Sequence, residues 1–202
     1  MGYAHYWNRP RIITPTTFSR IADDFSRLGS EWERLAVPLA GPLGRGRPLV
    51  GRQEIAFNGR IRCRHPIPSK SSLLGRLLAV TSLMSMADNE REEAGRQLWE
   101  EEHSQRRCPG NCAFETFWFP RMAPLGAVDA VGDGRYWDRT KTAHRPYDLA
   151  VTAALLIARR HLGGVLHIDS DGGQAQWWEA RLLCQTVLGY GFKVRLGLHD
   201  ED

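Results

Sequence analysis

The stretch from Leu149 to Ile157 constrains the fold more than any other part of this chain. It reads LAVTAALLI, so Thr152 supplies its only polar side chain. A helix with apolar side chains on every side has to lie buried. Pro146 suits the first turn of such a helix, where a backbone N–H is not needed. We therefore expect a central buried helix over residues 146–162, around which the other elements pack.

Length and composition favour an ordinary globular protein. The chain has 202 residues, enough to bury a sizeable core. It shows no secretion signal and no run of roughly 18 apolar residues, so we expect a cytoplasmic location and no membrane association. The formal charge of +4 is compatible with a nucleic-acid partner, although the arginines are scattered along the chain.

Two other stretches have the pattern of helices. In residues 15–36 large apolar side chains recur every three or four positions, and Thr14 before Pro15 is a typical N-cap and first helical residue. Residues 174–188 form the second stretch, since Asp171 followed three positions later by glutamine is typical of a capping box.

Short alternating or aromatic-rich stretches predict the strands. They are residues 2–8, 53–57, 115–119, 165–169 and 192–196. Asn58-Gly59 is a turn signal after the second of them. The order of elements indicates an α+β fold, in which a mostly antiparallel sheet packs on three helices. It matches the ferredoxin-like (split βαβ) arrangement with an extra C-terminal helix and strand.

Residues 60–113 interrupt this pattern. Their apolar periodicity breaks down, and residues 88–107 are dense in charge, with Leu98 and Trp99 as the large apolar side chains. We therefore expect a single α+β domain over residues 1–202 that carries a partly mobile insertion at 60–113. If exposed, Leu98 and Trp99 are candidate anchors for a protein partner.

Several motifs from both ends of the chain occur together in one known family. They are MGYAHYW, AFNG, ETFWFPR, KTAHRPYDLAVTAALLIA, and SDG followed by LCQTVLGYG. In these motifs the chain resembles a family of uncharacterised bacterial and phage proteins, over residues 1–59 and 114–191. The resemblance implies that the two ends belong to one domain, and it implies no activity, ligand or catalytic residue.

The start of the central helix is a candidate anion site. Lys141, Thr142 and Arg145 precede it, and the first N–H groups of a helix attract phosphate or carboxylate. Tyr147 and Tyr6 are further candidate ligand contacts. These residues predict a binding module for a nucleotide or a nucleic-acid phosphate. The alternative is that the cations are ordinary loop residues.

The second candidate function is a hydrolase-type enzyme. His5 would act as an acid–base group with Asp148 or Asp169, because all three fall at the ends of predicted elements. The segment VLHIDSDGG, residues 165–173, also resembles the nucleophile strand of haloacid-dehalogenase-type phosphatases. Too few residues follow it for the partner groups of that family, and a strand end followed by a capping box explains the same letters.

Four residues at the two ends of the insertion could form a structural zinc site. They are Cys63, His65, Cys108 and Cys112. Three thiolates and one imidazole complete a tetrahedral shell, although the spacing is not that of a common zinc knuckle. The alternative is two surface turns with free thiols.

The aromatic residues of the first predicted strand leave two alternatives open. Tyr3, His5 and Trp7 share one face, whereas Ala4 and Tyr6 share the other. Aromatic side chains on an open sheet face can stack nucleic-acid bases, and in a core they fill the space under the helices.

Overall fold

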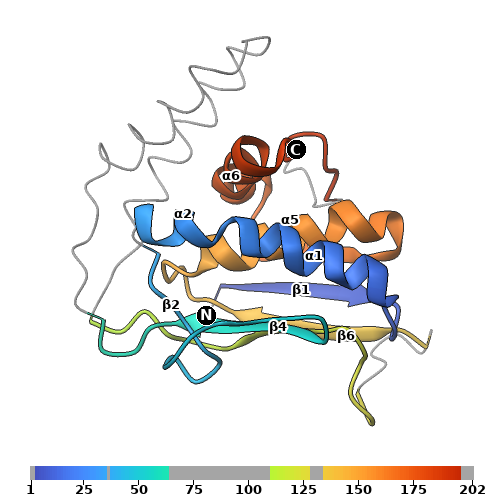
Figure 1. The fold of residues 1–202 in the computed structure, drawn as a ribbon, viewed down its shortest axis with the longest axis horizontal. Coiled ribbons are helices and arrows are strands. Elements are labelled where there is room, and N and C mark those ends of the chain that lie inside the picture. The colour runs from blue at the N-terminus through green and yellow to red at the C-terminus, as the bar shows by residue number, and fades with distance from the viewer. Residues whose placement is uncertain (1–2, 36, 64–109, 128–133, 197–202) are drawn as a thin grey trace.

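The strands of the protein lie under a layer of helices (Figure 1). The computed structural model describes residues 3–35, 37–63, 110–127 and 134–196. One antiparallel sheet has the order β6 (Tyr136–Lys141), β1 (Ala4–Arg9), β7 (His167–Ser170). A second sheet has the order β2 (Leu39–Ala40), β4 (Glu54–Gly59), β3 (Leu49–Val50), and β5 (Phe117–Pro120) also pairs with β4. The helices are α1 (Pro15–Arg27), α2 (Gly29–Arg34), α5 (Asp148–Leu162) and α6 (Trp178–Leu188), with 3-10 turns at Gly163–Val165 and Gln174–Trp177.

These elements confirm the α+β class. Strands β6 and β7 both run antiparallel to β1 and are connected through α5, so β1 lies between the two strands of a split βαβ unit. The complete ferredoxin-like arrangement is not confirmed. Among the described residues, no ladder of strand hydrogen bonds joins the two sheets. A single isolated bridge pairs Ile12, which follows β1, with Met122, which follows β5.

Helix α5 lies at the centre, as its apolar sequence predicts. All side chains from Asp148 to Ala158 are buried, and Figure 1 shows α5 between the strands and α6. The helix begins at Asp148 and not at Pro146. The reason is a preceding turn, in which the N–H of Asp148 donates to the carbonyl of Arg145 and the N–H of Arg145 donates to that of Thr142. The described helices include none long and apolar enough to cross a membrane.

The helix predicted over residues 15–36 is divided in two. Thr14 caps α1 as expected, since its side chain accepts from the N–H of Thr17. Leu28 then ends α1, and α2 begins at Gly29. The change of direction at Leu28 allows Trp32 to pack against Phe25, with 5.7 Å between the ring centroids.

The turn predicted at Asn58-Gly59 is wrong, because both residues belong to β4. The side-chain amide of Asn58 pairs with the backbone of Phe114 as a neighbouring strand would. Its nitrogen donates to the carbonyl of Phe114, and its oxygen accepts from the N–H of Phe114. Gly59 is required by a close approach, because a Cβ atom there would lie 1.9 Å from the carbonyl oxygen of Cys112.

Two further local predictions are corrected near the C-terminus. Residues 192–196 form no strand, because arginine side chains occupy the carbonyl groups that a neighbouring strand would need. Arg181 donates to Val194 and Arg159 donates to Arg195. The capping box at Asp171 is also absent, because the N-cap of the following turn is Gly173, which has no side chain to accept a hydrogen bond from the first N–H groups.

Strand β6 was not predicted, because Tyr136–Lys141 reads as part of a polar loop. Its side chains alternate between the helix layer and the open face only once it pairs with β1. Most of the predicted insertion, including Leu98 and Trp99, lies outside the described residues. Its partial mobility and its role in binding a protein therefore stay predictions.

The carboxylate of Asp24 connects α1 to the C-terminal ends of α5 and α6. It accepts hydrogen bonds from Nε2 of His161 at 2.8 Å and from the hydroxyl of Tyr190 at 2.5 Å. Burial alone would raise the pKa of Asp24. The hydrogen bonds from Tyr190 and His161, together with the charges of His161 and Arg27, outweigh it and hold the pKa below its ordinary value.

This shift predicts a stability difference that depends on pH. Because the folded-state pKa is depressed, the stabilisation is present above a pH of about 4 and is lost as the pH falls through the lower folded-state pKa. We expect Asp24→Asn to lower the free energy of unfolding by about 1 kcal/mol at neutral pH, measured by urea unfolding. The difference from the wild type should vanish in acid. Asp23→Asn, at an exposed neighbour, is the control, and an Asp24→Asn effect that persisted unchanged in acid would contradict the assignment.

Candidate functional site

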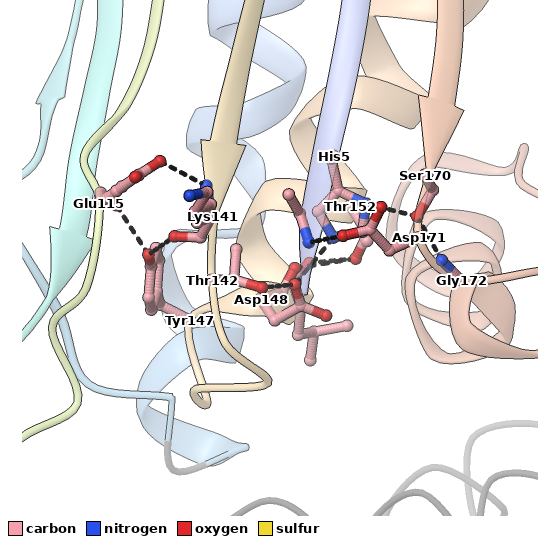
Figure 2. Close-up of polar contacts among 12 residues, drawn as sticks. His5, Glu115, Lys141, Thr142, Tyr147, Asp148, Thr152, Ser170, Asp171 and Gly172 are labelled. Atoms are coloured by element: carbon pink, nitrogen blue, oxygen red, sulfur yellow. Dashed lines mark hydrogen bonds and ion pairs between the residues drawn. The ribbon is translucent and has the colours of Figure 1, made fainter. Parts of the chain in front are cut away.

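Three elements meet at one end of the three-stranded sheet and bring polar side chains together. Strand β1 contributes His5, the end of β7 contributes Ser170, and the first residue of α5 is Asp148. The antiparallel register places His5 directly opposite Ser170. Figure 2 shows His5 between Ser170 on one side and Asp148 on the other.

Both ring nitrogens of His5 have partners. Nε2 lies 2.8 Å from Oδ1 of Asp148, and Nδ1 lies 2.9 Å from Oγ of Ser170. The His5 side chain is 0% exposed, and that of Asp148 is 5% exposed. The two contacts therefore hold the imidazole in one orientation, with Nε2 directed at Asp148 and Nδ1 directed at Ser170.

Two side chains contact the same carboxyl oxygen of Asp148. Besides His5, the hydroxyl of Thr142 donates to Oδ1 at 2.5 Å, and Thr142 is itself fully buried. A carboxylate at this position can accept at Oδ1 from both the Thr142 hydroxyl and Nε2 of His5. Its charge favours the tautomer of His5 that carries the proton on Nε2, which leaves the lone pair of Nδ1 directed at Ser170.

The hydroxyl of Ser170 completes a consistent chain of donors and acceptors. It can donate to Nδ1 of His5, while its oxygen accepts from the N–H of Gly172 at 3.1 Å. Ser170 is partly exposed, unlike His5. The serine is therefore the member of the group that meets solvent, with a base behind it.

Aromatic rings hold His5 in place. Tyr3 and Trp177 both contact the imidazole edge-on, with ring centroids 5.0 and 5.2 Å away. On its other side Tyr3 stacks against His144 at 3.8 Å. The buried face of β1 thus carries His5 and Trp7, Tyr3 is buried just before the strand, and Tyr6 lies on the open face.

Asp171 connects the end of β7 to the start of β1. Its carboxylate accepts from the N–H of Ala4 at 2.9 Å and from the hydroxyl of Tyr6 at 3.3 Å. Burial, followed by the charge of Asp171, raises the pKa of Tyr6 above its ordinary value. Tyr6 is thus a neutral hydroxyl at the edge of the group.

Comparisons with known proteins add no relative to this picture. No protein-family model matches the chain, and searches of the curated proteins and of the solved structures found no similar protein. The function therefore has to be inferred from the residues themselves.

The two carboxylates predicted as partners of His5 occupy different places. Asp148 contacts His5 directly, whereas Asp169 is exposed and lies opposite Tyr6 in the sheet register. Oδ1 of Asp169 accepts from the N–H of Ser170 at 2.8 Å. Asp169 thus shapes the end of β7, and Asp148 is the acidic neighbour of the imidazole.

The residues predicted to bind an anion belong to separate groups of contacts. Thr142 belongs to the His5 group, because its hydroxyl donates to Asp148. Figure 2 shows Lys141 and Tyr147 next to Glu115, to one side of the His5 group. The Tyr147 hydroxyl donates to the carbonyls of Glu115 and Lys141, and burial raises its pKa. Arg145 donates to the carbonyl of Asn111.

The predicted zinc ligands are described only in part. Cys63 and Cys112 are both buried, with their sulfur atoms 3.1 Å apart. His65 and Cys108 lie outside the described residues. Within the described ranges, no three metal-ligating side chains come together.

The sequence did not predict the contacts of Ser170 with His5 or of Thr142 with Asp148. The signal for Ser170 was the Ser-Asp-Gly sequence at the end of a short apolar strand, a place where ligands tend to lie in sheet proteins. Thr142 was predicted to contact an anion, and its hydroxyl bonds the anionic carboxylate of the protein's own Asp148.

Proposed function

We propose that the protein is a hydrolase-type enzyme in which Ser170 is the nucleophile, His5 the general base and Asp148 the group that orients the base. The observation that carries the proposal is the continuous chain from Ser170 Oγ to His5 Nδ1 at 2.9 Å and from His5 Nε2 to Asp148 at 2.8 Å. A nucleophile, a base within hydrogen-bond reach and a third group orienting the base are the signature of nucleophilic catalysis.

The proposed chemistry is acyl transfer to water. Oγ of Ser170 attacks the carbonyl carbon of an ester or amide while its proton passes to Nδ1 of His5. The imidazolium then donates that proton to the leaving alcohol or amine as the tetrahedral intermediate collapses. A water molecule, deprotonated by His5, releases the acid and regenerates the serine. Asp148 stabilises the imidazolium through its bond to Nε2 and keeps its own charge.

The ring presents Nδ1 to the nucleophile and Nε2 to the carboxylate. Either nitrogen of a neutral imidazole can accept a proton, and the hydrogen bond to the other nitrogen decides which one does. In the proposed mechanism Asp148 accepts a hydrogen bond from Nε2, 2.8 Å away, so the base is Nδ1. Thr142, by donating to the same carboxylate, holds Asp148 in the geometry this needs.

This function is favoured over anion binding at the start of α5. The carboxylate of Asp148 stands in the first turn of the helix, where an incoming anion would be repelled. The hydroxyl of Thr142 is already bonded to that carboxylate, and Arg145 donates to a backbone carbonyl. The anion site stays a prediction without a specific observation in its support.

A fluorophosphonate probe tests the proposal, because it forms a covalent bond with an activated serine and needs no knowledge of the substrate. We expect one modified residue in the full chain, mapped to Ser170 by peptide mass spectrometry. Ser170→Ala should abolish the modification, and His5→Ala should slow it by about 10²–10⁴-fold.

Ser26→Ala, at an exposed serine of α1, is the matched control and should leave the rate unchanged. Circular dichroism spectra would verify that each variant is folded. Absence of labelling in the wild type, or labelling that survives Ser170→Ala, would show that the His5 group only connects β1, β7 and α5.

A further inference from the structure

Two cysteine thiols meet at the end of β4, away from the His5 group. Sγ of Cys63 lies 3.1 Å from Sγ of Cys112, although 49 positions separate the two residues in the sequence. Cys63 is 4% exposed and Cys112 is 0% exposed. The fold therefore brings two distant thiols together inside the protein.

The two thiols lie outside the main cluster of the hydrophobic core. The core cluster includes the third described cysteine, Cys184, which lies in α6 among apolar side chains. Neither Cys63 nor Cys112 belongs to that cluster. A buried cysteine usually behaves as a small apolar side chain, and these two instead face each other.

The backbone around the pair is held firmly. The N–H of Cys112 donates to the carbonyl of Arg60 at 3.0 Å, just after the end of β4. Gly59 has no side chain where the Cys112 carbonyl approaches. Arg62, with a φ of 50°, turns the chain immediately before Cys63. Both thiols are thus positioned by backbone contacts within a few residues of one strand end.

The spacing of the sulfur atoms suits metal ligands. A disulfide requires about 2.05 Å between them, so the pair would have to close by about 1 Å. Two thiolates on one tetrahedral zinc ion, each about 2.3 Å from the metal, lie about 3.8 Å apart. That needs an opening of only about 0.7 Å, within the freedom of two side-chain rotations.

We propose that Cys63 and Cys112 supply two thiolate ligands to a zinc-class metal ion. Each thiol releases its proton on binding, and the two thiolates balance the charge of a divalent cation. The described residues assign two positions of the tetrahedral shell. The proposal does not depend on the function assigned to the His5 group.

Metal content and thiol protection of the full chain test this site. Protein purified without chelator is expected to carry about one zinc ion per chain by native mass spectrometry. Cys63→Ser and Cys112→Ser should each reduce the content at least tenfold. Cys184→Ser removes a buried thiol of the core and should leave the content unchanged.

A second measurement uses the wild type alone, so it holds even if a serine variant fails to fold. A chelator should release the zinc and increase the alkylation rate of Cys63 and Cys112 at least tenfold, while Cys184 stays protected. Replacing zinc by cobalt should produce a thiolate-to-cobalt charge-transfer absorption. Wild-type protein without zinc and without that absorption, or with Cys63 and Cys112 joined in a disulfide as purified, would overturn the proposal.

Discussion

Asp148→Asn is expected to slow the reaction of Ser170 with a fluorophosphonate by about 10²–10⁴-fold while the protein stays folded. The asparagine oxygen can still accept from Thr142 and from Nε2 of His5, so the geometry of the group is retained. Its negative charge is lost, and the imidazolium that forms during attack by Ser170 is no longer stabilised. The second-order labelling rate measures the effect directly.

The control for this result is Asp169→Asn. Asp169 is exposed, lies opposite Tyr6 in the register and does not contact the imidazole among the bonds recorded for the described residues. Its variant should label at the wild-type rate to within about twofold. An Asp148→Asn protein that labels as fast as the wild type would remove Asp148 from the proposed mechanism. Equal losses in both variants would indicate a general effect of charge.

Gly59→Ala should be among the most destabilising single substitutions in the described part of the chain. A Cβ atom at this position would lie 1.9 Å from the carbonyl oxygen of Cys112 and 3.0 Å from the ring of Tyr147. The nearest obstacle is backbone, which cannot rotate away as a side chain can. We expect the free energy of unfolding, measured with urea, to fall by about 3 kcal/mol or more.

Gly29→Ala is the matched control for this substitution. Gly29 is the first residue of α2, and a Cβ atom there would meet nothing within 4 Å. Because alanine loses less backbone entropy than glycine in a helix, we expect a gain of about 0.5 kcal/mol. A Gly59→Ala protein as stable as the wild type would mean that the chain at Cys112 can move away from β4.

The elements that the sequence predicted well are those whose signal is local. The central helix follows from an apolar run in which Thr152 is the only polar side chain, and α1 follows from a threonine cap before a proline and regularly spaced apolar residues. Such patterns depend on the chemistry of neighbouring residues, and packing in the folded protein reinforced them.

The elements predicted wrongly depend on contacts with distant residues. Asn58-Gly59 has the letters of a turn, yet the amide of Asn58 pairs with Phe114 and the missing side chain of Gly59 admits Cys112. Residues 192–196 alternate like a strand, yet their carbonyl groups are used by Arg181 and Arg159. No local pattern records that a residue 13, 36 or 56 positions away has taken these hydrogen bonds.

The candidate site divides in the same way. The residue types of its acid–base pair, His5 with Asp148 or Asp169, were evident from polar groups at the ends of apolar segments. The choice of Asp148, and the addition of Ser170, came from the register of β1 with β7 and from the position at which α5 starts. The sequence alone determines which side chains with acid, base or hydroxyl groups are available. The hydrogen bonds of His5 to Asp148 and to Ser170 join residues 143 and 165 positions apart, so they form only after the strands have paired and the apolar helix has been buried against them.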